Sequence, residues 1–311
     1  MKKLLTCFLL LAFAKAVTAQ QDPQYSQYMY NPIVINPAYA GNRGVASIMG
    51  LHRSQWVGLD GAPRTQTLSF HTPIAYSRVG LGFSIVNDEI GPANETYAAA
   101  DFSYTIPVGM TGDLSFGLKG GVHLLNVDFN QLNIANPGDD FFANNIENRL
   151  SPTVGVGVFY HTDRFYAGLS TPNLLQTDHF SEDAENSSTA YIAEERIHYF
   201  GTAGYVFDLN DNLKFKPATL VKVVPGAPLQ VDVTANFLFN EKLTLGAAYR
   251  WSAAVTALAG FQLNDQMMIG FAYDRETTAL GNAVYNDGSY ELFLRFELFS
   301  RFSRIITPRF F

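Results

Sequence analysis

The residue types that most often carry out chemistry are scattered along this chain. The sequence contains no His-Glu-x-x-His zinc motif, no Gly-x-Ser-x-Gly nucleophile motif and no phosphate-binding loop. The six histidines occur singly, without the close spacing of a metal-binding pair: His52, His71, His123, His161, His179 and His198. We therefore expect no catalytic residue, no cofactor and no metal site, and we expect that the protein is not an enzyme.

Acidic residues also lack the pattern of a binding site. Three acidic pairs fall in the two longest connections, where solvated surface charge is the simplest interpretation: Asp139-Asp140, Glu182-Asp183 and Glu194-Glu195. Segment 208–212 imitates a calcium loop, but it lacks the central glycine and the closing glutamate. A calcium site is therefore not expected at either place.

The remaining charged residues recur inside segments of alternating polarity. Ten of them fall on the more polar face: Lys119, Lys214, Lys216, Lys222, Arg250 and Arg295, with Asp101, Asp232, Glu291 and Glu297. Such side chains could line a water-filled channel, or they could pair across a filled interior. The sequence leaves both possibilities open, so the elements that carry these residues come next.

Alternation with a period of two runs through most of the chain. Between residues 230 and 237, polar residues at even positions alternate with apolar residues at odd positions, and segments 113–124 and 242–251 repeat the pattern. Segment 290–298 does so with Phe293 as the exception. This period indicates β-strands with two unlike faces.

About fourteen such strands are predicted. They lie near 45–56, 65–72, 78–87, 95–106, 113–127, 152–161, 164–170, 195–207, 212–224, 230–240, 242–251, 253–263, 266–273 and 289–298. Most are close to the roughly 9–11 residues that a tilted strand needs to cross a bilayer. An even number of strands of this length predicts an all-β fold, a transmembrane antiparallel β-barrel in the outer membrane.

The connections support a barrel over a soluble sandwich. If the first connection is external, the outer loops are 57–64, 88–94, 128–151, 171–194, 225–229, about 251–253 and 274–288. All three long connections then fall on one side, as outer-membrane barrels require. Gly80, Gly82, Gly155 and Gly157 fall on the presumed inner face, where we expect them to relieve crowding at a curved wall.

The first 19 residues predict a signal peptide. Lys2 and Lys3 precede a short apolar run, and small residues lie ahead of Gln20. The single cysteine, Cys7, lies in this segment, so we expect neither disulfides nor thiolate chemistry in the rest of the chain. Removal of three lysines leaves 18 of the 21 basic residues against 28 acidic ones, which argues against binding to nucleic acid. Charged residues make up 16% of the chain, below the roughly 25% of soluble domains.

Both ends of the expected barrel, residues 45–299, carry segments that do not alternate. Residues 20–44 are apolar and aromatic and contain two Asn-Pro steps, so we expect a plug or hatch packed inside the lumen and not a wall strand. Residues 300–311 contain Arg301, Arg304 and Arg309 and predict a periplasmic or lumen-docked tail.

Residues 21–41, QDPQYSQYMYNPIVINPAYAG, resemble the opening of the PorP/SprF family of the Bacteroidota. Residues 52–73, HRSQWVGLDGAPRTQTLSFHTP, and the closing ITPRFF at 306–311 are similar to that family as well. The resemblance implies an outer-membrane component of the type IX secretion system. It implies, as partners, outer-membrane lipid and either the C-terminal domain of a secreted adhesin, including adhesins of gliding motility, or periplasmic ring and lipoprotein subunits.

The expected partner-binding residues are apolar or polar positions outside the wall strands. We expect them to be exposed and to matter for assembly while the barrel folds without them: Tyr28, Asn31, Pro32, Asn36, Pro37, Arg309, Phe310 and Phe311. The alternative function is a channel for small or hydrophobic solutes, similar to a porin or to FadL-type transporters, whose hatch the Asn36-Pro37-Ala38 step weakly resembles. In a porin, loop 128–151 would fold inward and constrict the opening.

Overall fold

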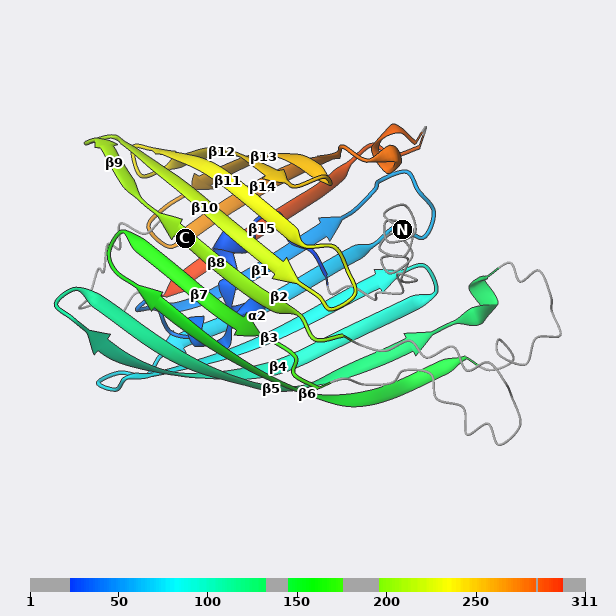
Figure 1. The fold of residues 1–311 in the computed structure, drawn as a ribbon, viewed down its shortest axis with the longest axis horizontal. Helices are drawn as coiled ribbons and strands as arrows, with labels where there is room; N and C mark the ends of the chain where they lie inside the picture. Colours follow the sequence, from blue (N-terminus) through cyan, green and yellow to red (C-terminus); the bar gives the residue numbers. More distant parts are fainter. Residues whose placement is uncertain (1–22, 133–144, 176–195, 284, 299–311) are drawn as a thin grey trace, which may run out of the picture.

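One antiparallel sheet closes on itself and forms a barrel (Figure 1). The computed structural model describes residues 23–132, 145–175, 196–283 and 285–298. Neighbouring strands pair in chain order, and the pairs β1 with β15 and β10 with β11 complete the ring. β8 and β9 both pair with β10 and are separated only by Val206, so they occupy one place in the wall. The predicted 14-stranded barrel is confirmed.

The strands and short helices have the following bounds. The first half of the wall consists of β1 (Ala46–Ser54), β2 (Arg64–Pro73), β3 (Val79–Ile90), β4 (Ala93–Val108), β5 (Gly112–Val127), β6 (Ile146–His161) and β7 (Phe165–Thr171). The second half consists of β8 (Tyr199–Tyr205), β9 (Phe207–Asn210), β10 (Leu213–Val223), β11 (Gln230–Phe239), β12 (Leu243–Arg250), β13 (Ala254–Gln262), β14 (Met267–Glu276) and β15 (Ser289–Leu298). Short helices are η1 (Tyr28–Tyr30), α2 (Pro32–Ile35), η2 (Pro37–Tyr39), η3 (Phe129–Gln131) and η5 (Ala279–Asn282). No helix in the described ranges is long and apolar enough to cross a membrane.

The two faces of the wall have the polarity of a membrane barrel. Leu68, Phe116 and Leu292 point outward and are 52%, 47% and 48% exposed, whereas the inward side chains of Ser115 and Lys216 are fully buried. An apolar exterior around a polar interior is the reverse of a soluble protein and suits a lipid-facing surface. The period-two pattern in the sequence therefore identified both faces correctly.

The two ends of the barrel differ in the length of their connections. The loop end carries connections 55–63, 91–92, 128–145, 172–198, 224–229, 251–253 and 277–288. The turn end carries 74–78, 109–111, 162–164, 211–212, 240–242 and 263–266, together with the start of β1 and the end of β15. The three long connections share one end, as the sequence predicted.

Several strand boundaries differ from the sequence-based prediction, most clearly at β3, β4 and β6. The expected loop 88–94 is only Gly91 and Pro92, and β6 begins at Ile146 and not at residue 152. Here the strands continue with polar outward side chains that pair with each other, since the Thr96 hydroxyl donates to Asn87 at 2.8 Å. Backbone pairing continues into water there, beyond the apolar pattern on which the prediction relied.

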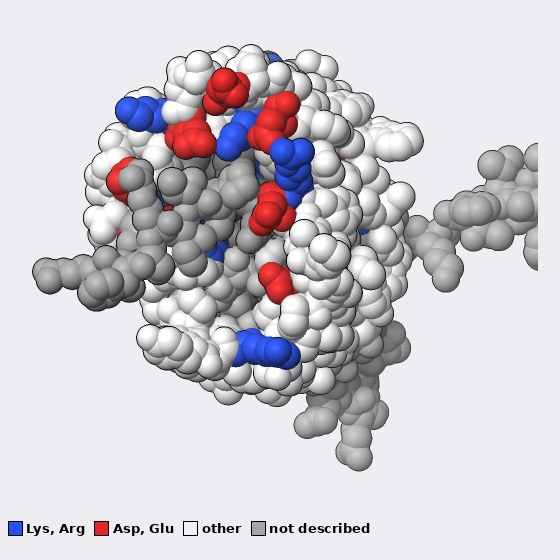
Figure 2. All heavy atoms as spheres, turned by 90° about the vertical axis from the view of Figure 1, so that its left-hand side faces the viewer, with Lys and Arg blue, Asp and Glu red and all other residues white. Residues whose placement is uncertain are grey.

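Charged side chains at the turn end gather on one side of the rim (Figure 2). Two ion pairs lie at these turns: Arg164 with Asp208 at 2.6 Å, and Lys214 with Glu241 at 3.2 Å. Asp208 begins the segment that imitates a calcium loop, and in the structure its carboxylate contacts a cation of the neighbouring turn. Solvated rim charge accounts for this segment.

Candidate functional site

The N-terminal segment, residues 23–44, runs along the inner wall from the loop end to the turn end (Figure 1). Near the loop end, the Gln24 amide donates to Gln230 at 3.2 Å, and Arg250 donates to Gln24 at 3.1 Å. Near the turn end, the carbonyl of Ala40 accepts a hydrogen bond from Ser103 of β4 at 2.7 Å. The segment thus passes the full height of the wall before β1 begins.

The two Asn-Pro steps shape this path. Asn31 precedes α2 and Asn36 precedes η2, with proline at the first turn of each helix, where its missing N–H is not needed. The Asn36 side chain accepts from Ala38 N at 3.0 Å and donates to the carbonyl of Val158 in β6 at 3.1 Å. Each step therefore starts a short helix, and Asn36 also fastens the segment to the wall.

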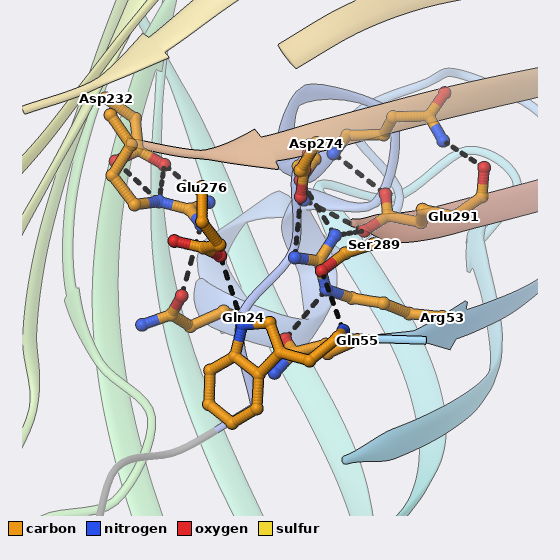
Figure 3. A network of polar contacts seen from close by, with 12 residues as sticks. Gln24, Arg53, Gln55, Asp232, Asp274, Glu276, Ser289 and Glu291 are labelled. Carbon is orange, nitrogen blue, oxygen red and sulfur yellow. Dashed lines mark hydrogen bonds and ion pairs between the residues drawn. The ribbon is translucent and has the colours of Figure 1, made fainter. Parts of the chain in front are cut away.

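A buried seam network holds the start of the segment where the barrel closes (Figure 3). We define it as Ser26, Gln27, Arg53, Asp274 and Glu291. Arg53 on β1 lies 2.6 Å from Asp274 on β14 and 3.1 Å from Glu291 on β15, and it is 1% exposed. One cation faces two carboxylates, so the remaining oxygens require further donors.

The N-terminal segment supplies those donors. The main-chain N–H groups of Ser26 and Gln27 donate to the two oxygens of Glu291 at 2.9 and 2.8 Å. The Ser26 hydroxyl donates to Asp274 at 2.5 Å and accepts from Arg53 at 2.8 Å. Charge-assisted hydrogen bonds of this kind are about twice as strong as neutral ones. The seam network therefore ties three wall strands and the segment together.

Farther along the segment, wall side chains bind its main chain. Lys119 donates to the carbonyl of Ile33 at 3.4 Å and pairs with Asp101 at 2.8 Å. Ser170 of β7 donates to the carbonyl of Ile35 at 2.7 Å. The N–H of Gly41 donates to His71 Nδ1 at 3.3 Å. These contacts come from β2, β5 and β7.

Glycines in the wall provide the room for this close approach. A methyl group at Gly80 would overlap the carbonyl of Ala40, one at Gly117 would overlap the main chain of Ala38, and one at Gly157 would overlap Asn36. The expectation that wall glycines relieve crowding at a curved wall is too general, because these residues make room for the N-terminal segment: Gly80 and Gly117 face its main chain, and Gly157 faces the Asn36 side chain. At Gly155 the neighbour is the main chain of Pro172.

Aromatic residues of the segment pack against inward apolar side chains. The rings of Tyr30 and Phe293 lie 4.8 Å apart, which explains why Phe293 breaks the alternation of β15. Tyr28 and Tyr30 are only 3% and 6% exposed, so both side chains are buried inside the wall.

Outside the wall, hydrogen bonds from Gln131 and Asn130 lower the pKa of Asp128, which keeps this carboxylate charged where the loop 128–145 begins. It also accepts from Asn145 at 2.9 Å and so links the two ends of that loop. Residues 133–144, the remainder of the loop expected to constrict a porin, lie outside the described residues.

The predicted partner-binding residues do not all lie where we expected. Tyr28, Asn31, Asn36 and Pro37 are buried against the wall and Pro32 is partly buried, so the prediction that they are exposed is wrong. Apolar residues outside a strand still avoid water, and the glycine-lined wall receives them. A role in partner binding stays a prediction. Arg309, Phe310 and Phe311 lie outside the described residues, as do the predicted signal peptide and the three acidic pairs of the loops.

Most of the predicted inner charges are paired. Lys119 contacts Asp101, Arg250 contacts Asp232 at 2.9 Å, Arg295 contacts Glu297 at 3.1 Å, and Lys214 contacts Glu241 at the rim. Lys216 and Lys222 lie over the rings of Tyr166 and Phe200 at 5.5 and 5.9 Å. These contacts favour a filled interior over a charged channel.

Sequence reasoning missed Arg53, Asp274 and Ser26, although the first two fall at inward positions of their strands.

Two hollows lie at different places along the segment. The loop-end hollow is mostly apolar and is lined by Tyr25, Val34, Ile35, Val86 and Phe200 among others. The turn-end hollow lies against residues 40–44 and includes Arg78, Asp113 and His161 in its lining. The segment contributes to both linings, and no residue lines both hollows.

Comparisons with known proteins agree with this architecture. Residues 17–296 match the profile of the family described as "Type IX secretion system membrane protein PorP/SprF". The monoaromatic hydrocarbon channel CymD has a similar fold, with 11% identity, 89% of this chain and 94% of that chain covered, and a TM-score of 0.50. The outer membrane protein Omp33 of Acinetobacter baumannii matches with 8% identity, 82% and 98% coverage and a TM-score of 0.47. No curated protein matches significantly.

Proposed function

Because the chain belongs to the PorP/SprF family of type IX secretion system membrane proteins, we propose that it supports the export or surface attachment of a secreted adhesin. The family match over residues 17–296 carries this proposal and identifies an outer-membrane component of the secretion system. We also propose that the chain acts on an adhesin or on ring and lipoprotein subunits, and that it is not an enzyme.

The N-terminal segment is proposed to act as a plug. Its contacts with β4, β5, β6, β7, β14 and β15 cross the interior, and separate hollows lie against its earlier and later residues. Paired inner charges also favour a closed barrel over an open porin. A plugged barrel suits a protein that binds partners at its ends better than one that passes solutes freely.

The first experiment is an affinity pull-down of the tagged barrel from gently solubilised outer membranes, followed by mass spectrometry. Recovery of the C-terminal region of a large adhesin, or of periplasmic ring and lipoprotein subunits, would support the secretion role and identify its type. Recovery of the barrel alone would contradict it and favour the channel. Conductance in liposomes would then test that alternative.

A second experiment addresses the predicted partner-binding residues. Alanine variants across residues 28–37 and 309–311 should reduce secretion and partner retention while the barrel still inserts. Heat-modifiable migration in gels monitors folding, and an alanine variant of the outward Leu68, which is 52% exposed, serves as the control. Unchanged secretion and partner retention would show that these residues do not bind partners.

A further inference from the structure

The inner wall binds atoms that every polypeptide possesses. Between residues 33 and 41, Lys119, Ser170 and Ser103 bind main-chain carbonyls at 3.4, 2.7 and 2.7 Å. At the loop end, Glu291 accepts two consecutive main-chain N–H groups. Contacts to the main chain do not depend on the side chains of the bound segment. The wall therefore carries a binding surface for polypeptide backbone.

Two glycines of the inner wall also face main-chain atoms of the segment. Gly80 and Gly117 face the main chain of Ala40 and Ala38, and a methyl group at either glycine would overlap backbone atoms that cannot rotate away. By contrast, Gly120 on the outer face of β5 has no atom within 4 Å of an added methyl group. The space on the inner face thus has the shape of a polypeptide chain.

Hollows adjoin the resident segment near both of its ends. The loop-end hollow presents apolar surface beside Tyr25, Val34 and Ile35. The turn-end hollow continues from residues 40–44 toward Arg78 and Asp113. A longer chain along the same path would bury apolar side chains at one end and meet charged side chains at the other.

We propose that this backbone groove, defined by Gly80, Ser103, Gly117, Lys119 and Ser170, is a binding site for a polypeptide segment of a partner protein, and that the N-terminal segment is its resident, exchangeable occupant. The inference rests on the proposed function only for the source of that polypeptide, which would be the secreted protein. The site itself is argued from the wall contacts.

The test traps an added peptide in the groove of the full-length protein. Ala40 Cβ lies 3.5 Å from the position that a Cβ at Gly82 would occupy, within the range for a disulfide. The probe is a synthetic peptide of residues 23–44 with alanine at position 33, to avoid the overlap of Ile33 with the new side chain, and an activated cysteine at position 40. It is added to the Gly82→Cys barrel.

The expected result is a mixed disulfide that forms at least about tenfold faster with Gly82→Cys than with Gly120→Cys, whose cysteine lies on the outer face. Adding Ser26→Ala should accelerate trapping further, because the resident segment then loses its hydrogen bonds to Asp274 and Arg53. Equal rates at the two cysteines, or no trapping even with Ser26→Ala, would overturn the inference.

A second peptide tests whether recognition uses the main chain. Replacing Ile35 and Tyr39 of the probe with alanine should leave the trapping rate within about threefold, because the bonds at residues 35 and 40 are made by carbonyls. A complete loss would show that side chains dominate and would contradict the backbone groove. Failure of trapping with a successful pull-down would place the partner elsewhere, whereas trapping with an empty pull-down would contradict the proposed function alone.

Discussion

Arg53 is the residue on which the closing seam of the barrel depends. It contacts Asp274 and Glu291 within a buried cluster, and each of the three residues is 1% exposed. Removing one partner of a buried ion pair leaves an uncompensated charge, which generally costs about 3–5 kcal/mol. Replacing Arg53 would leave two such carboxylates next to the N-terminal segment.

We predict that Arg53→Gln lowers the free energy of unfolding by about 3 kcal/mol. The measurement is urea unfolding in lipid vesicles. Arg64→Gln is the matched control, because Arg64 lies on the next strand, faces outward and is exposed. If the two variants shifted the unfolding midpoint equally, the seam network would have no special role.

The N-terminal segment shows what an element-level prediction from sequence can and cannot reach. Two Asn-Pro steps excluded a wall strand, and the structure has two short helices there. Its path was not predictable, because the residues that hold it, such as Ser103 and Ser170, are ordinary wall positions far away in the sequence. Likewise the break at Val206 between β8 and β9 leaves no signal in the alternation.

Gly117→Ala should loosen this element. The new methyl group would overlap the main chain of Ala38, so residues 36–40 must move. Overpacking of this kind typically costs about 1–3 kcal/mol. Hydrogen exchange at residues 36–40 should become faster than in the wild type, whereas Gly120→Ala on the same strand should leave it unchanged. Equal protection from hydrogen exchange in both variants would argue against close packing of residues 36–40 on Gly117.

At the scale of the whole molecule, the strand pattern alone indicated a membrane barrel. An outward Leu68 and an inward Thr67 follow from alternation, and so does the sorting of long connections to one end. Whether the interior is open does not follow, since an inward Lys119 is compatible with a channel until Asp101 and Ile33 are found beside it. That information lies in the pairing of distant strands.

The final prediction concerns passage through the barrel. Because the N-terminal segment runs the height of the inner wall and contacts β4, β5, β6, β7, β14 and β15, the wild-type protein should show little conductance in planar lipid bilayers. Gly117→Ala displaces the segment near Ala38 and should increase the open probability on the order of tenfold, whereas Gly120→Ala should not. A large steady conductance in the wild type would mean that the segment does not close the lumen. If both variants stayed closed while hydrogen exchange showed Gly117→Ala to be loosened, the paired wall charges would be the barrier instead of the segment.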